Sequence, residues 1–450
     1  MKLDEDKTIY GVFEVAGDIF SGRIIVSPNN HIKLILTTTY RQAIDDKYFG
    51  QNIPIIHGTT IDPTNRITII DTALTGKIGP ISGPKFGLLQ YTFLSNVLII
   101  GEYLEENTLL DNLCLCSADL NKYLGNYLSE ASFHFTSNLT TANISLPCEK
   151  DINNHSSSEI KIKLSVISNI EKQNLHSKFS IEPLYLIILE YASQKQLYPL
   201  IDYTFLVETF LSFIFQKDCA LNEVAYFRKK QTIDFISGKN KDYEIYHHIY
   251  YKHDEVLNKE YNEKDVLYPN TFFSKHFSQM LYNWYKLMSN IEYMRYFVLN
   301  YFKIKYIDQK IIAQINLFEA LHKHYYGVKQ DGIQINERNQ SILSQIGNTD
   351  DKVFIESILR SKNGFGMRKK LDDICKKSGL NNLTRQEIES INIIRSKFSH
   401  GTVDDNFDIE KYRSLNKKLN EIIICLIKKE IELDIDQTQE AACPMPLNAN

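Results

Sequence analysis

An arginine and a histidine with four residues between them, Arg395 and His400, lie near the end of a segment with helical periodicity. Arginine carries a permanent positive charge on a planar fork that matches phosphate oxygens. Histidine is the side chain that exchanges protons near neutral pH, and the end of a helix favours its protonated form. The pair therefore suits metal-free cleavage of RNA. A base takes the ribose 2′-hydroxyl proton, that oxygen attacks the adjacent phosphorus, and a cation stabilises the developing charge.

The spacing has a second interpretation, in which Arg395 is a surface charge and His400 ends the helix. At about 100° per residue, five positions place the two side chains about 140° apart around one helix. They would not easily converge on one phosphate from a single straight helix. A shared site built from two copies of the helix resolves this, and a symmetric dimer supplies both copies.

The helix that carries this pair has clear start and stop signals. Thr384-Arg385-Gln386-Glu387 is a capping box, so we expect the helix to begin there, and Gly401 is the stop signal. Its apolar stripe consists of Ile388, Ile391, Ile394 and Phe398.

The two halves of the chain have different periodicities, which predicts an α+β, multidomain fold. Residues 1–195 alternate with period 2 between turn-forming residues, as in 9–15, 20–26 and 160–166, and predict an antiparallel β-rich domain, sandwich-like or barrel-like. Apolar residues recur at spacings of three and four from about Thr271 onward, which predicts an all-α helical bundle over 271–436. We expect 196–270 to be a mixed helical and linker region and 437–450 a disordered tail.

Three segments carry a resemblance to a known family. The Arg-x4-His element resembles the motif of HEPN-domain ribonucleases, and Leu317-Phe318-Glu319-Ala320-Leu321-His322 resembles a helix of the ApeA-like HEPN branch. The segments Gly11-Val12-Phe13 and 20–26 are similar to the β-rich domain that precedes HEPN in ApeA-like proteins.

The resemblance implies a helical bundle, a HEPN domain, that dimerises and places Arg395 and His400 of both chains in one cleft. It implies metal-independent endoribonuclease activity in anti-phage defence by abortive infection, with no cofactor. The N-terminal domain would sense a phage-derived trigger or restrain the bundle. The family commonly has Asn, Asp or His after the arginine, whereas this chain has Ser396, which can still hydrogen-bond a phosphate or orient the histidine.

Further residues are candidates to support such a site. Glu319 could orient His400 or pair with Arg395, and a structural carboxylate is the alternative. A basic loop around 363–366 could hold an RNA backbone and stack a base, although a solvated turn between helices explains it as well. The candidate RNA-binding residues are Arg360, Lys362, Arg368, Lys369, Lys370 and Lys397.

Composition argues against several other classes of function, namely nucleic-acid binding by bulk charge, metal binding and membrane insertion. The formal net charge of −4 argues against binding nucleic acid by bulk charge but leaves room for a local basic patch. We expect no metal site, because neither Cys114 and Cys116 nor His247, His248 and His253 have partners at zinc-ligand spacing. No run approaches the roughly 18 apolar residues of a membrane helix, and the charged start lacks a signal-peptide core, so we expect a cytoplasmic protein with reduced cysteines.

A different class of function stays open from the sequence. The helical bundle could be a non-catalytic dimerisation or nucleotide-binding module, with the β domain binding a partner or a carbohydrate. The residue that favours this alternative is Ser396.

Overall fold

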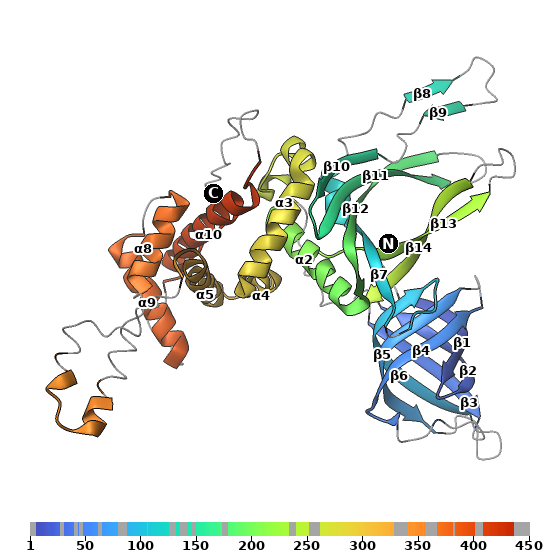
Figure 1. The fold of residues 1–450 in the computed structure, drawn as a ribbon, viewed down its shortest axis with the longest axis horizontal. Coiled ribbons are helices and arrows are strands. Elements are labelled where there is room, and N and C mark those ends of the chain that lie inside the picture. Colours follow the sequence, from blue (N-terminus) through green and yellow to red (C-terminus); the bar gives the residue numbers. More distant parts are fainter. Residues whose placement is uncertain are drawn as a thin grey trace. The chain divides into compact units, whose positions relative to one another are not determined.

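The computed structural model of the chain divides into two units, an N-terminal unit that ends at Leu281 and a C-terminal unit that begins at Tyr282. Figure 1 shows the helices and strands of both units. The structure describes residues 6–435 except for 28–30, 40–43, 45–47, 62–64, 80–87, 106, 126–131, 136–141, 146–149, 173–178, 234–239, 252–261, 328–340, 342, 354, 356–366, 381–382 and 401–407. The predicted tail at 437–450 lies outside the described residues.

Six antiparallel strands of the N-terminal unit close into a barrel, seen in blue in Figure 1. The sheet order β6-β3-β2-β1-β4-β5 returns on itself because β5 also pairs with β6. Alternate side chains fill the interior, among them Phe13, Ile24, Leu34 and Phe93, all fully buried. The six strands are β1 (Lys7–Val15), β2 (Asp18–Val26), β3 (Ile32–Thr39), β4 (Asn52–Thr60), β5 (Arg66–Ile78) and β6 (Leu88–Ile100).

Local chemistry explains the first hairpin of the barrel. Ala16 and Gly17 both have positive φ, which is the conformation of a two-residue turn that matches strand twist. On β4, Gly58 faces the ring of Phe13, with which any side chain at this position would collide. The strands predicted at 9–15 and 20–26 are confirmed by β1 and β2.

Further strands extend the barrel into one sheet of twelve described strands. The six additional strands lie in the order β10-β11-β12-β7-β13-β14, and β14 pairs with β6 of the barrel. Two helices, α1 (Ala118–Leu124) and α2 (Leu197–Phe215), contact β12, and α2 also contacts β7. The remaining strands are β7 (Leu109–Cys116), β8 (Ser132–Phe135), β9 (Ala142–Ser145), β10 (Lys150–Ser156), β11 (Ile160–Lys172), β12 (Phe179–Gln196), β13 (Glu223–Ile233) and β14 (Asn240–Tyr251), of which β8 and β9 form a separate hairpin.

Within the predicted mixed helical and linker region at 196–270, the linker expected from residue 238 onward is wrong for the segment that forms β14, which pairs with β13 as a hairpin. This hairpin lies between β7 and β6, so it joins the barrel to the rest of the sheet. Buried His247, Ile249 and Tyr251 alternate with more exposed neighbours, which is the period of a strand with one buried face. The composition of β14 hides that period, because two of its buried positions are held by histidine and tyrosine, which also occur at exposed positions of the strand.

Helix α2 is apolar and long enough, by length and composition alone, to cross a membrane. In the structure 67% of that stretch is buried, and core helices pass the same test. Its Glu208 is buried and accepts hydrogen bonds from the Leu221 backbone N–H at 3.1 Å and the Tyr251 hydroxyl at 3.0 Å. These bonds join α2 to β14 and to the residues just before β13.

The C-terminal unit is a helical bundle, as the periodicity predicted. Helix α5 contacts α4, α8, α9 and α10, and its Ile311, Ile315 and Phe318 are fully buried. Buried Gln314 donates to the Tyr301 hydroxyl at 2.8 Å and to the Asn416 carbonyl at 3.1 Å. The helices are α3 (Asn270–Asn290), which spans the boundary of the units, α4 (Glu292–Tyr301), α5 (Ile307–Tyr326), α8 (Met367–Ser378), α9 (Arg385–His400) and α10 (Ile409–Ile431).

Candidate active site

Helix α9, which carries the Arg-x4-His element, begins with the capping box that the sequence predicted. The Thr384 backbone N–H donates to Glu387 Oε2 at 2.6 Å, and the Glu387 backbone N–H donates to Thr384 Oγ1 at 3.2 Å. The helical backbone runs to His400, so Arg395 lies in the second-to-last turn and His400 at the end. The side chains of 396–400 and the predicted stop at Gly401 lie outside the described residues.

Glu387 has a second role, because it also joins α9 to α10. Lys418 Nζ lies 2.8 Å from Glu387 Oε2. Burial alone raises the pKa of the Glu387 carboxyl, but hydrogen bonds from Lys418 and Thr384 outweigh burial and hold that pKa below its usual value. The ionised carboxylate is therefore the form that stabilises the start of α9.

We expect Glu387→Ala to destabilise the bundle by about 1 kcal/mol at pH 7. The pKa of Glu387 is lower in the folded state than in the unfolded state, so its carboxylate stabilises the wild type fully at pH values above about 4.3. This stabilisation, which Glu387→Ala lacks, decreases as the pH falls through the folded-state pKa. Thermal unfolding of both proteins between pH 3 and pH 7 should show a difference in Tm that shrinks toward low pH. Glu389→Ala, on the same helix, is the control. A difference in Tm that is independent of pH would contradict the assignment.

Arg395 is joined to two other helices through one carboxylate. Its Nη2 lies 3.3 Å from Glu319 Oε1 of α5, and Lys370 Nζ of α8 lies 2.9 Å from the same oxygen. The Arg395 side chain is 47% exposed and that of Glu319 is 25% exposed. Three predicted residues thus meet, with the guanidinium of Arg395 and the ammonium of Lys370 on one carboxylate. The Arg395 guanidinium is partly exposed, which suits an anionic ligand.

The structure places the other predicted residues as follows. Arg368 and Lys369 are exposed in the first turn of α8, and Lys369 Nζ lies 3.4 Å from Asp373 Oδ1. Together with Lys370 they put three cations where the helix dipole disfavours positive charge, a local cost that often marks a functional surface. Arg360 and Lys362 lie outside the described residues, as do the side chains of Ser396 and Lys397.

Sequence reasoning missed a second connection between α5 and α8. His322 is 2% exposed, and its Nε2 lies 3.3 Å from Asp373 Oδ2. Its ring stacks on Tyr326, whose hydroxyl donates to the Asp373 carbonyl at 3.0 Å. His322 follows Glu319 by three residues and Asp373 follows Lys370 by three, so two parallel links join the facing helices. The i, i+3 pair Glu319 and His322 was the signal that could have revealed it.

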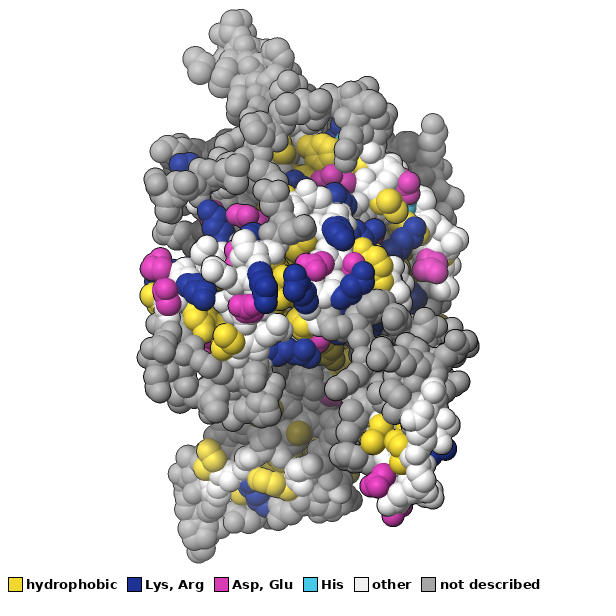
Figure 2. Space-filling view, turned by 90° about the vertical axis from the view of Figure 1, so that its left-hand side faces the viewer, with side chains coloured by type: hydrophobic (Ala, Val, Ile, Leu, Met, Phe, Trp, Pro, Cys, Tyr) yellow, Lys and Arg dark blue, Asp and Glu magenta, His cyan; other side chains and the backbone are white. Residues whose placement is uncertain are grey.

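Charged side chains of both signs lie close together on the surface drawn in Figure 2. Lys and Arg side chains stand beside one another there, with Asp, Glu and hydrophobic side chains between them. Such a surface gives local positive sites without a large uniform field, in line with the nearly neutral net charge of −4.

The described residues include no cluster of three or more His, Cys, Asp or Glu side chains placed to hold a metal ion. Cys114 and Cys116 are buried on β7 and neither is in a disulfide. Burial raises the pKa of the Cys116 thiol, and Asn121 donates a hydrogen bond to its Sγ at 3.2 Å. Both are accounted for as core side chains.

A unit built on a β-barrel, followed by a helical bundle, defines a multidomain α+β protein. Residues 9–284 match the family model described as ApeA N-terminal domain 1, and residues 312–437 match the one described as Apea-like HEPN. The chain belongs to the family of ApeA-like HEPN proteins. Neither a curated protein nor a solved structure matches it.

Proposed function

We propose that the protein is a metal-independent endoribonuclease of the HEPN type that acts in anti-phage defence by abortive infection. The proposal draws its class from the Apea-like HEPN match at 312–437. The observation that carries it is the cluster of Arg395, Glu319 and Lys370, which brings three helices together one and a half turns before His400. A partly exposed guanidinium held by Glu319, with the Lys370 ammonium on the same carboxylate, suits a phosphate.

In the proposed mechanism His400 takes the proton from a ribose 2′-hydroxyl, and that oxygen forms a bond to the adjacent phosphorus. The bond from phosphorus to the 5′-oxygen breaks, and the leaving oxygen receives a proton from His400 of the second copy in a homodimer. Arg395 stabilises the negative charge that develops on the phosphate oxygens. The products are a 2′,3′-cyclic phosphate and a 5′-hydroxyl. One proton is taken from the 2′-hydroxyl and one is given to the 5′-oxygen, so no net proton is consumed.

Glu319 acts in this scheme as a positioning residue, because it holds Arg395 in place and does not touch the RNA. The exposed cations at the start of α8, Arg368 and Lys369, bind the RNA backbone beside the cleft, together with Lys370 and Lys397. Ser396 hydrogen-bonds a phosphate oxygen or orients His400. The β-rich unit senses the phage-derived trigger.

The test is incubation of purified protein with RNA in the presence of EDTA. Cleavage is expected, because every group in the mechanism belongs to the chain or to the RNA. Cleavage that depends on an added divalent metal would contradict the mechanism.

A second candidate function is a non-catalytic HEPN module for dimerisation or nucleotide binding. It is favoured by Ser396, which departs from the Asn, Asp or His found after the arginine in the resembling family. Overexpression separates the two. An unrestrained ribonuclease arrests growth in a manner that needs Arg395 and His400, whereas a binding module does not.

A further inference from the structure

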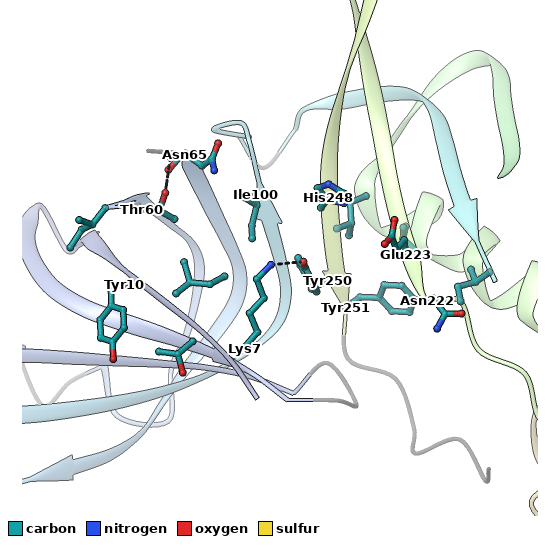
Figure 3. Close-up of a pocket in the computed structure, with 16 residues that line it drawn as sticks. Lys7, Tyr10, Thr60, Asn65, Ile100, Asn222, Glu223, His248, Tyr250 and Tyr251 are labelled. Carbon is teal, nitrogen blue, oxygen red and sulfur yellow. Dashed lines mark hydrogen bonds between the residues drawn. The ribbon is translucent and has the colours of Figure 1, made fainter. Parts of the chain in front are cut away.

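A cavity in the N-terminal unit lies at one end of the barrel, between β1 and the hairpin of β13 and β14. Its volume is about 660 Å³, within the range of roughly 300–1,000 Å³ typical of ligand sites. Figure 3 shows Tyr10, Thr60 and Asn65 of the barrel on one side, and Asn222, Glu223 and His248 on the other.

The cavity faces the edge of β1. Four consecutive residues of this strand, Lys7 to Tyr10, line it. Successive side chains of a strand point to opposite faces, so a cavity that touches all four lies against the backbone edge between those faces. In the part of the chain that the structure describes, the pairing of β1 with β4 starts only at Gly11, whereas β2 pairs with β1 from Lys7 onward.

The direction of the backbone groups follows from one hydrogen bond. The Ile61 backbone N–H donates to the Tyr10 carbonyl at 3.0 Å, so the polar groups of Tyr10 point away from β2. Residues two apart on a strand point their N–H and C=O groups the same way. The N–H and C=O of Thr8 therefore point toward the cavity, beyond the end of β4.

The side chains around this edge are mostly apolar, with charges of both signs. Ile9, Ile61 and Ile249 line the cavity, and Tyr10 and Ile61 are 57% and 67% exposed. Lys7 donates a hydrogen bond to the Tyr250 hydroxyl at 3.2 Å, drawn in Figure 3, and Glu223 supplies the opposite charge. A polyanion such as a nucleotide would gain one ammonium but meet a carboxylate.

We propose that this cavity binds an extended peptide segment of a partner protein. The segment adds as a further strand to the edge of β1 at Thr8, which has no partner strand on that side among the described residues. The backbone of Thr8 supplies hydrogen bonds that any sequence can make, and the isoleucines accept alternate apolar side chains of the peptide. Lys7 binds an acidic side chain of the same segment. This inference concerns binding alone and holds whether or not the bundle cleaves RNA.

The test separates backbone pairing from side-chain contact by two substitutions at one exposed position. Thr8→Pro removes the N–H that faces the cavity and leaves the ladder to β2, since proline is tolerated where the N–H of an edge strand is unpaired. Thr8→Val keeps the N–H. The full-length protein is panned against a library of random nine-residue peptides, and enriched peptides are synthesised for titration by calorimetry.

We expect enriched peptides with apolar residues at alternate positions. Their affinity should fall about tenfold or more in Thr8→Pro and stay within about threefold in Thr8→Val. Lys7→Met should weaken acidic peptides, whereas Lys33→Met on the exposed face of β3 should not. Unchanged Tm values in all variants show that the barrel is intact. No enrichment over the starting library, or equal binding by Thr8→Pro and Thr8→Val, would overturn the proposal.

Discussion

His400→Ala is expected to slow RNA cleavage by about 10²- to 10⁴-fold, the usual effect of removing a general acid–base group. Arg395→Ala is expected to slow it by about 10²- to 10³-fold, because a preorganised positive charge at the developing oxyanion is lost. Arg395→Lys should recover only part of this loss, since an ammonium keeps the charge but lacks the planar fork. The measurement is the initial rate of cleavage of a labelled RNA by each purified variant.

The helix itself supplies the control for these substitutions. Arg385 lies at the other end of α9, is 79% exposed and pairs with Glu389 at 3.1 Å. Arg385→Ala therefore removes an arginine from the same helix without touching the proposed site, and its cleavage rate should equal that of the wild type. Equal Tm values for all variants would exclude unfolding as the cause. Cleavage that survives both Arg395→Ala and His400→Ala would disprove the assigned roles.

Trp284→Ala is expected to destabilise the C-terminal unit by about 3–5 kcal/mol, the largest stability effect that we predict. Trp284 is fully buried in α3 and is the only tryptophan of the chain. Its neighbour Asn283 donates to the carbonyls of Ile431 and Leu433 at 3.1 and 2.8 Å, which fixes α3 against the end of α10. Trp284→Ala would leave a cavity in the core beneath α3, one residue away from this contact.

Denaturant unfolding followed by far-ultraviolet circular dichroism measures this effect. Trp284→Phe should lose less stability than Trp284→Ala, because a phenyl ring fills part of the space. Tyr296→Ala on α4 replaces an exposed aromatic residue and should change stability by less than about 0.5 kcal/mol. If the free energy of unfolding of Trp284→Ala were within about 1 kcal/mol of the wild-type value, the packing described for α3 would be wrong.

Elements with strong local signals could be predicted from the sequence. Thr384 and Glu387 form the predicted capping box, and Gly327 ends α5 with positive φ and an N–H bonded to the Lys323 carbonyl. These features depend on residues only three or four positions apart, so the sequence contains them directly. Strand β14 was missed because its buried positions are held by histidine and tyrosine as well as isoleucine.

The candidate site could be predicted only in part. Glu319 was a candidate with several possible partners, and the structure selects Arg395 together with Lys370. The link between His322 and Asp373 joins residues 51 positions apart. The packing of the whole bundle decides which faces of α5 and α8 meet. Residues close together in the sequence do not determine that packing. The edge of β1 at Thr8 depends likewise on where β4 ends.

The most direct test of the proposed ribonuclease is the chemical nature of the ends that it produces. RNA cleaved in the presence of EDTA should carry a 2′,3′-cyclic phosphate on one fragment and a 5′-hydroxyl on the other. A single 2′-deoxynucleotide placed 5′ to the scissile phosphate should abolish cleavage there, because the attacking oxygen is missing. Fragments with a 3′-hydroxyl and a 5′-phosphate, or cleavage that persists at the 2′-deoxynucleotide, would contradict the mechanism.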